Sequence, residues 1–371
     1  MIPISKPSID EREIQQVTKV ISNGQLAQGD NVYAFEEAFA DHFDYKYSAA
    51  TSNGTAGLHV ALKAAGVKTG DIVLTTPFSF IATTNAIIYC GAIPVFIDID
   101  DKTFNISPEK LREKLIEYPN VKYLLIVHLF GQPCQMDEIM DLVVSKELIL
   151  IEDCCQAHGA TFQEKTVGSF GHVSVFSFYP TKNMTTGEGG MIVTHSRELF
   201  EKCKLLINHG SKKKYMHEVT GYNYRMTEMA AAIGLEQLKK LNSMNLKRRS
   251  NAEFYKKHIS NEFIQLPFNR ENIEHVYNAF TIMTEYRDEL IEYLSLKQIG
   301  TSIYYPLSIN LQDSVQDYLS AMNETVSHCP ISGMVSKKVL SIPMYPGLTE
   351  PELKYISETV SSFIPRAVLT K

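Results

Sequence analysis

Short apolar runs alternate with helical segments through the first two thirds of the chain, and this alternation restricts the fold. The apolar runs are rich in β-branched residues and contain few polar positions, which is typical of strands buried on both faces. Helices between such strands favour a parallel sheet. We therefore predict an α/β fold with a mostly parallel central sheet covered by helices on both faces. The predicted strands are Tyr47–Thr51, Ile72–Thr76, Pro94–Ile97, Tyr123–Val127, Leu148–Ile151, Val173–Phe178 and Met191–Thr194, and the clearest helices are Thr55–Ala65, Ile81–Cys90 and Pro108–Leu115.

A helix is also predicted near the start of the chain. Ser8–Glu11 has the spacing of a capping box, and Gly24 would end the helix. Between them, Ile14, Val17 and Ile21 form an apolar stripe at helical spacing.

The pattern changes after about residue 245, and we predict two domains. Residues 1–245 would form a large cofactor-binding domain, with the N-terminal segment reaching the second domain, and residues 246–371 a small α+β domain. A helix capped by Thr227 should end near Leu241, and a new one should begin at Lys247. The further elements predicted are strands at Tyr277–Met283 and Ser302–Tyr305 and helices at Arg287–Lys297 and Thr349–Phe363.

Bulk properties indicate a cytoplasmic enzyme rather than a nucleic-acid-binding or membrane protein. The formal net charge of the 371 residues is -6, and the N-terminus carries neither a basic nor an apolar targeting region. The six cysteines are scattered, which favours reduced thiols. His158 and His209 lack metal-ligand spacing, so we expect no metal.

The residues of chemical interest concentrate between Ile151 and Ile192. Asp153 directly follows a predicted strand, and Lys182 follows the next one, ahead of a glycine-rich segment, Gly187–Gly190. Pyridoxal phosphate (PLP) enzymes need an amine that binds the aldehyde and a carboxylate that keeps the pyridine nitrogen protonated. The segment therefore predicts PLP as the cofactor.

Two weaker features agree with this prediction. The turn at Thr51–Leu58 connects a strand to a helix, and backbone amides at a helix N-terminus bind phosphate, although most such turns are only caps. Phe78 and Phe80 follow another strand and could stack on a ring or simply belong to the core. The chain has neither a phosphate-binding Gly-Lys-Ser/Thr loop nor the glycine fingerprint of nicotinamide enzymes.

Nearly the whole chain resembles the DegT/StrS-like PLP-dependent nucleotide-sugar aminotransferases, which have the fold type I architecture of aspartate aminotransferase. The resemblance is carried by GQLAQG, NGTAGLHVAL, PFSFIATTNAI, GAIPVFIDID and VHLFGQPCQM in the first part of the chain. It continues in IEDCCQAHGA, SFYPTKNMTTGEGG, GYNYRMTEMAAAIGLEQL and LSIPMYPGLT.

The resemblance assigns a role to each matching position. Lys182 would bind PLP as a Schiff base, and Asp153 would pair with its pyridine nitrogen. Gln156 would lie beside the ring and Phe80 would stack on it. The phosphate-binding residues would be Thr55, Ala56, Ser177 and, from the neighbouring subunit, Asn223, which implies a homodimer with shared active sites.

The resemblance implies transamination from L-glutamate to a nucleotide-linked keto-6-deoxy sugar, at C-4, with the cofactor alternating between PLP and pyridoxamine phosphate (PMP). The product would be an amino sugar nucleotide for polysaccharide biosynthesis. Some relatives with His in place of Lys182 are dehydratases, so the lysine favours transamination. Tyr304 stands where relatives often carry His before Tyr-Pro, which leaves the sugar contacts open. The basic run Lys212–Lys214 is either a solvated loop or a diphosphate contact.

Three alternatives stay open at this point. The first is a PLP-dependent lyase, dehydratase or cyclitol aminotransferase on the same scaffold. The second is a PLP-binding regulator without turnover, although no helix-turn-helix segment is attached. The third is a nicotinamide-dependent sugar oxidoreductase, which the missing glycine fingerprint disfavours.

Overall fold

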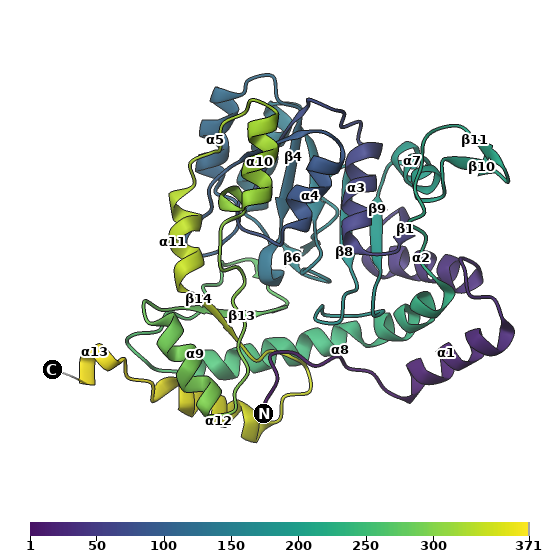
Figure 1. Ribbon diagram of the computed structural model, residues 1–371. Helices are drawn as coiled ribbons and strands as arrows, with labels where there is room; N and C mark the ends of the chain where they lie inside the picture. The colour runs from purple at the N-terminus through teal and green to yellow at the C-terminus, as the bar shows by residue number, and fades with distance from the viewer. Residues whose placement is uncertain (370–371) are drawn as a thin grey trace.

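A seven-stranded sheet forms the centre of the computed structural model, which describes residues 1–369 (Figure 1). The strand order is β1-β9-β8-β5-β4-β2-β3, and only β9 runs antiparallel to its neighbours. All seven predicted strands are present, which confirms the α/β fold class. The strands are β1 (Tyr47–Thr51), β2 (Ile72–Thr75), β3 (Ile93–Phe96), β4 (Tyr123–Val127), β5 (Ile149–Asp153), β8 (Val173–Ser177) and β9 (Gly190–Thr194).

Helices cover both faces of this sheet. Val175 of β8 belongs to an apolar cluster with α3, α4 and α7 on one face. Its neighbour Phe176 points the other way, into a cluster with α2 and α8. This two-sided burial explains why the strands read as continuous apolar runs. The helices are α1 (Glu11–Asn23), α2 (Asp30–Phe43), α3 (Gly54–Ala64), α4 (Ala82–Tyr89), α5 (Pro108–Glu117), α6 (Met136–Ser145), α7 (Arg197–Ile207), α8 (Glu228–His258), α9 (Arg287–Leu296), α10 (Asp313–Ala321), α11 (Pro330–Lys338), α12 (Glu350–Ser361), α13 (Arg366–Leu369) and the 3-10 turns η1 (Leu129–Gly131) and η2 (Ile309–Leu311).

The remaining strands are short and lie outside the central sheet. They are β6 (Thr161–Phe162), β7 (Lys165–Thr166), β10 (Ser211–Lys213), β11 (Met216–His217), β12 (Ile273–Glu274), β13 (Phe280–Met283) and β14 (Val339–Ile342).

Helix α1 forms, but its cap and its buried face differ from the prediction. The capping box consists of Asp10 and Glu13 rather than of Ser8–Glu11, and Gly24 ends the helix with a φ of 74°. More than half of the Ile14 and Ile21 surfaces is exposed, so the apolar stripe is not buried in this chain. Glu13 faces α8 instead, because it forms an ion pair with Lys240 there.

Helix α8 is continuous, which corrects the predicted break between Leu241 and Lys247. Figure 1 shows it as a long rod beneath the sheet that reaches the C-terminal helices. The basic residues that suggested a new start lie inside it. Among them, Arg248 is buried, and it donates hydrogen bonds to the carbonyl oxygens of Tyr277 (3.1 Å) and Met344 (3.0 Å). Burial lowers the Arg248 pKa to about 10.

A second apolar core lies at the C-terminal end of α8. It packs α8 against α9, α12 and the antiparallel pair β13–β14. The N-terminal segment joins this core, because the Ile2 amide donates to the Gln298 carbonyl (2.8 Å). The predicted strand Ser302–Tyr305 is wrong, since only Ser302 forms an isolated bridge, to Ser341. The helix predicted from Thr349 is present, and Thr349 caps it.

We propose that the two cores correspond to a large and a small domain that divide near residue 245, inside α8. One element complicates this division. Val315 and Leu319 of α10 pack back into the large core, beside α5 and β3.

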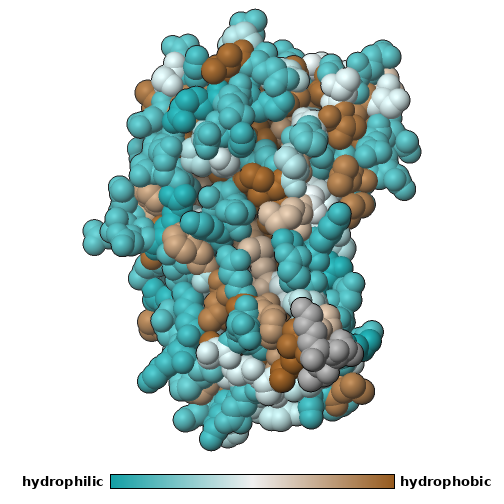
Figure 2. Space-filling model, turned by 90° about the vertical axis from the view of Figure 1, so that its left-hand side faces the viewer, coloured by the Kyte–Doolittle hydropathy of each residue, from teal (hydrophilic) through white to brown (hydrophobic). Residues whose placement is uncertain are grey.

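The face in Figure 2 is mostly hydrophilic, with hydrophobic residues scattered over it in small groups. Within residues 1–369, no helix combines the length and the apolar character that a membrane span requires.

Candidate active site

A cavity of about 920 Å³ lies at the carboxyl ends of the central strands. Val127, Asp153 and Ser177, the last residues of β4, β5 and β8, all line it. This edge of an open α/β sheet is where ligands usually bind. Residues from the C-terminal part, including Asn278 and Tyr305, close the other side. The cavity therefore lies at the junction of the two cores.

The structure brings seven of the eight predicted site residues into this cavity. They are Thr55, Ala56, Phe80, Asp153, Gln156, Ser177 and Lys182. Asn223 is not among the lining residues; it is exposed and forms an isolated bridge with Asn208.

Asp153 is buried and its orientation is held by two donors. One carboxylate oxygen accepts a hydrogen bond from the Thr83 hydroxyl (2.8 Å), and the other accepts one from the Cys155 amide (3.1 Å). A buried carboxylate needs such partners to remain in place. Its remaining lone pairs are available to a ligand in the cavity.

Lys182 lies in the turn after β8 and is half-buried. Burial lowers its pKa, against the opposing effect of Cys155 and of the Asp153 carboxylate. A lowered pKa raises the fraction of uncharged amine, which is the nucleophilic form. The Asn278 side chain holds the turn, because it donates to the carbonyl oxygen of Thr181 (3.1 Å).

The N-terminus of α3 points into the cavity between β1 and β8. Asn53 caps the helix by accepting a hydrogen bond from the Ala56 amide (2.8 Å). That amide is therefore already paired, and a phosphate at Ala56 would have to replace this bond. Gly54 lies so close to β8 that a Cβ there would come within 2.7 Å of the Ser177 Cβ.

Gln156 is fixed in orientation by a backbone amide. Its side-chain oxygen accepts a hydrogen bond from the Phe130 N–H (2.7 Å), so its amide nitrogen must face the cavity. There it donates to the Tyr305 hydroxyl (3.1 Å). The Tyr305 ring lies between Phe78 and Phe80, with centroids 6.1 and 6.3 Å away.

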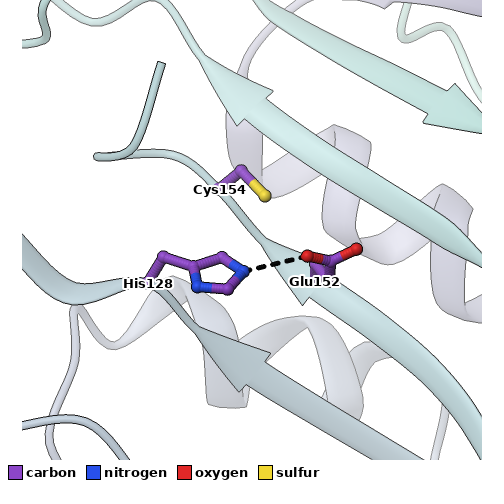
Figure 3. Close-up of side chains that lie close together, drawn as sticks. All are labelled: His128, Glu152 and Cys154. Carbon is purple, nitrogen blue, oxygen red and sulfur yellow. Dashed lines mark hydrogen bonds and ion pairs between the residues drawn. The ribbon is translucent and has the colours of Figure 1, made fainter. Parts of the chain in front are cut away.

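Next to the cavity, His128, Glu152 and Cys154 form a buried cluster (Figure 3). Their potential ligand atoms lie within 4.8 Å of one another, but both His128 ring nitrogens already have partners. Nδ1 accepts from the Cys134 amide (3.0 Å), so Nε2 carries the proton that it donates to Glu152 (2.9 Å). The cluster therefore contributes a buried hydrogen bond that connects His128, after β4, to Glu152 in β5.

Glu152 accepts further hydrogen bonds from the loop before β8. The donors are the amides of Gly168, Phe170 and Gly171 and the Ser174 hydroxyl. Burial alone would raise the Glu152 pKa, but the bond from His128 and these amides outweigh it and hold the pKa below its usual value. These hydrogen bonds to Glu152 thus hold β5, the strand that ends with Asp153, in place.

The basic run Lys212–Lys214 lies in the exposed hairpin β10–β11, which projects from the molecule beyond α7 (Figure 1). None of the three lysines lines the cavity of this chain. Within one chain, the solvated-loop interpretation holds.

Sequence reasoning missed Thr83, Asn278 and Tyr305 as parts of the site. Their partners Asp153, Thr181 and Gln156 lie 70, 97 and 149 residues away along the chain. Only Tyr305 carried a signal, as part of the segment that departs from the pattern of relatives.

Comparison with known proteins decides the family. The model of the DegT/DnrJ/EryC1/StrS aminotransferase family matches residues 7–361. The chain belongs to this family. GDP-perosamine synthase of Escherichia coli O157:H7 is 35% identical over 369 residues, which cover 98% of each chain. The dTDP-3-amino-3,6-dideoxy-alpha-D-galactopyranose transaminase of Aneurinibacillus thermoaerophilus is 36% identical over 355 residues, covering 95% of this chain and 96% of the relative. Among solved structures, NtdA from Bacillus subtilis with bound cofactor PMP superposes with a TM-score of 0.86 at 31% identity, covering 95% of this chain and 82% of NtdA.

This enzyme is a PLP-dependent aminotransferase of fold type I. Its cavity fits the cofactor. A buried carboxylate with free lone pairs suits a protonated pyridine nitrogen, and a lysine with a lowered pKa suits the aldehyde. The close approach of Gly54 to β8 lets the N-terminus of α3 reach the cavity, as phosphate binding requires.

Proposed function

We propose that this aminotransferase moves an amino group from L-glutamate to a nucleotide-linked keto-6-deoxy sugar, at C-4, and forms an amino sugar nucleotide. The observation that carries the proposal is the cavity that brings Lys182, Asp153, Gln156 and Phe80 together. The names of the two curated relatives support a sugar nucleotide as the acceptor. One of these names specifies a 3-amino sugar, so an experiment must decide whether this enzyme aminates its sugar at C-3 or at C-4.

In this proposal each residue has a defined task. PLP, when bound, withdraws electrons from the carbon next to the amino group and so makes its proton removable. Lys182 Nζ would take this proton from Cα of the amino donor and deliver it to C4′ of the cofactor. Asp153 would hold the proton on the ring nitrogen, Gln156 would donate to the ring oxygen, and Phe80 would cover one ring face.

The main alternative is a lyase, dehydratase or cyclitol aminotransferase. Lys182 disfavours the dehydratase, because some family members that act as dehydratases carry His at this position. A regulator without turnover is disfavoured because the full set of catalytic side chains lines one cavity.

The test is a panel of UDP-, dTDP- and GDP-linked 3-keto and 4-keto 6-deoxy sugars, each incubated with and without L-glutamate. We expect a glutamate-dependent amino sugar from one 4-keto substrate, with one 2-oxoglutarate released per amine. A product formed without glutamate would identify a lyase or dehydratase. The Lys182→Ala protein is the control, and turnover by it would refute the mechanism.

We further propose that the enzyme acts as a cytoplasmic homodimer with shared active sites. Among the residues 1–369 that line the cavity, Lys182 is the only basic side chain, and Asp153 and Glu188 are acidic. A cofactor phosphate and a nucleotide diphosphate would need more positive charge than this. A second copy that contributes Asn223 and, at the mouth, Lys212–Lys214 would supply the missing donors.

Subunit complementation tests this arrangement. Lys182→Ala and Asn223→Asp proteins should each be nearly inactive. If Asn223 serves the neighbour's site, mixed dimers contain one intact site, and an equal mixture should recover roughly a quarter of wild-type activity. No recovery after subunit exchange, shown with differently tagged chains, would place Asn223 in its own site.

A further inference from the structure

Three buried side chains form a continuous hydrogen-bonded chain in the wall of the cavity. The Thr83 hydroxyl oxygen lies 2.8 Å from an oxygen of Asp153, and the Ser79 hydroxyl oxygen lies 3.0 Å from that of Thr83. All three residues are at least 95% buried. Their side chains therefore have little contact with solvent outside the cavity.

The direction of this chain follows from the protons available. An ionised carboxylate has no proton, so Thr83 must donate to Asp153. The Thr83 hydroxyl has only one proton, so Ser79 can bond to it only as the donor, and Ser79 shares its own single proton between Thr83 (3.0 Å) and the Phe80 carbonyl oxygen (3.1 Å). The chain thus runs from Ser79 through Thr83 to Asp153.

The two oxygens of Asp153 are held by different parts of the fold. Thr83 lies in the first turn of α4, and the second donor, the Cys155 amide, follows β5. Donors on both oxygens fix the rotation of the carboxylate about its side-chain bonds. The lone pairs left over then face the ligand in one orientation.

The Thr83 hydroxyl is not needed as a helix cap. Its hydrogen bonds run to Asp153 and Ser79, and α4 begins without a side-chain cap. The next residue offers a comparison, because Thr84 is also fully buried but its hydroxyl has no partner among the described residues. Burial of a threonine here therefore does not by itself require a hydrogen bond.

We propose that Thr83 is a positioning residue, which sets the orientation of Asp153 toward the pyridine nitrogen of PLP. The proposal rests on the binding of PLP but not on the identity of the sugar. Without the Thr83 donor, Asp153 would hold the ring proton less firmly.

The test compares Thr83→Val, which removes the hydroxyl at nearly constant volume, with Thr83→Ser, which keeps it. Thr84→Val is the matched control. Each protein is freed of cofactor and titrated with PLP, and the visible absorption band of the loaded protein is followed against pH. We expect Thr83→Val to weaken PLP binding about tenfold or more, since hydrogen bonds to charged groups are the stronger ones. The band should also titrate at a higher pH, because a ring nitrogen that holds its proton less firmly withdraws fewer electrons from the Lys182 nitrogen.

Thr83→Ser and Thr84→Val should behave like the wild type in both measurements. The proposal is overturned if Thr83→Val also matches the wild type, or if Thr83→Ser is as impaired as Thr83→Val. If Thr83→Val does not fold, Thr83→Ala removes the same donor and decides the question by the same two measurements. Neither measurement uses the sugar, so a wrong sugar assignment would leave this result unaffected.

Discussion

The side chain of Gln156 donates a 3.1 Å hydrogen bond to the Tyr305 hydroxyl, and this bond joins the loop after β5 to a segment 149 residues further along the chain. Because the side-chain oxygen of Gln156 accepts from the Phe130 amide, its side-chain nitrogen faces Tyr305 and must be the donor of this bond. The Tyr305 hydroxyl accepts here, and its own proton is free to serve a ligand.

Replacing Tyr305 with Phe should lower kcat/KM for the sugar by roughly three- to tenfold, because the Gln156 amide loses one partner and the ligand loses a donor. Burial raises the Tyr305 pKa, so the hydroxyl stays protonated. The pH profiles of wild type and variant should therefore have the same shape between about pH 6 and 9. Steady-state kinetics over this range provide the measurement. An alkaline decline that disappears in Tyr305→Phe would contradict the neutral-donor role.

Asp153→Asn should retain PLP but slow the transfer of the amino group from glutamate by roughly a hundredfold or more, because a neutral amide no longer stabilises the protonated ring. Single-turnover absorbance with glutamate alone measures this step. Cofactor content, determined after denaturation, is the control. A variant that keeps PLP and reacts at the wild-type rate would exclude Asp153 from the chemistry.

Glu152→Gln should destabilise the fold by about 3 kcal/mol, since an amide in place of the buried carboxylate turns a donor toward other donors. In the wild type the folded pKa lies below the ordinary value of 4.5. The contribution of Glu152 is therefore complete above that pH and is lost as the pH falls through the lower, folded value. Urea unfolding at several pH values should show a steeper acid loss in the wild type than in Glu152→Gln. Glu113→Gln, at an exposed ion pair, is the control and should change stability by less than about 1 kcal/mol.

Gly54→Ala should destabilise the protein by about 1–3 kcal/mol and weaken PLP binding, because its Cβ would press on Ser177 and Cys155. Gly333→Ala is the matched control. Gly333 lies within α11 with open space where a Cβ would go, so this change should be stabilising by up to about 1 kcal/mol. Thermal unfolding and PLP titration of both variants provide the comparison. If the two substitutions changed stability and PLP binding equally, the close contact of Gly54 with Ser177 would not be the reason that position 54 needs glycine.

The central sheet could be predicted from sequence because each buried strand is a local apolar run. Asp153 and Lys182 could be found for a similar reason, since Asp153 ends one such strand and Lys182 lies in the turn after another. Parallel strands bring their carboxyl ends to one edge, so local signals sufficed to place both residues in one cavity.

The errors arose where distant contacts determine the structure. Lys247–Arg249 resembled a helix start, but the carbonyl groups of Tyr277 and Met344 satisfy Arg248 inside a continuous helix. Thr83 has no local feature that distinguishes it from Thr84, and only the fold decides which of the two meets Asp153.

The continuity of α8 also restricts how the enzyme can admit its substrate. A flexible linker would let the two cores swing apart, whereas a sharp kink in an unbroken helix would break backbone hydrogen bonds. Arg248 fastens the C-terminal half of α8 to the second core, because its carbonyl partners Tyr277 and Met344 both belong to that core. Substrate would then enter a cavity whose two walls keep one relative orientation during the catalytic cycle.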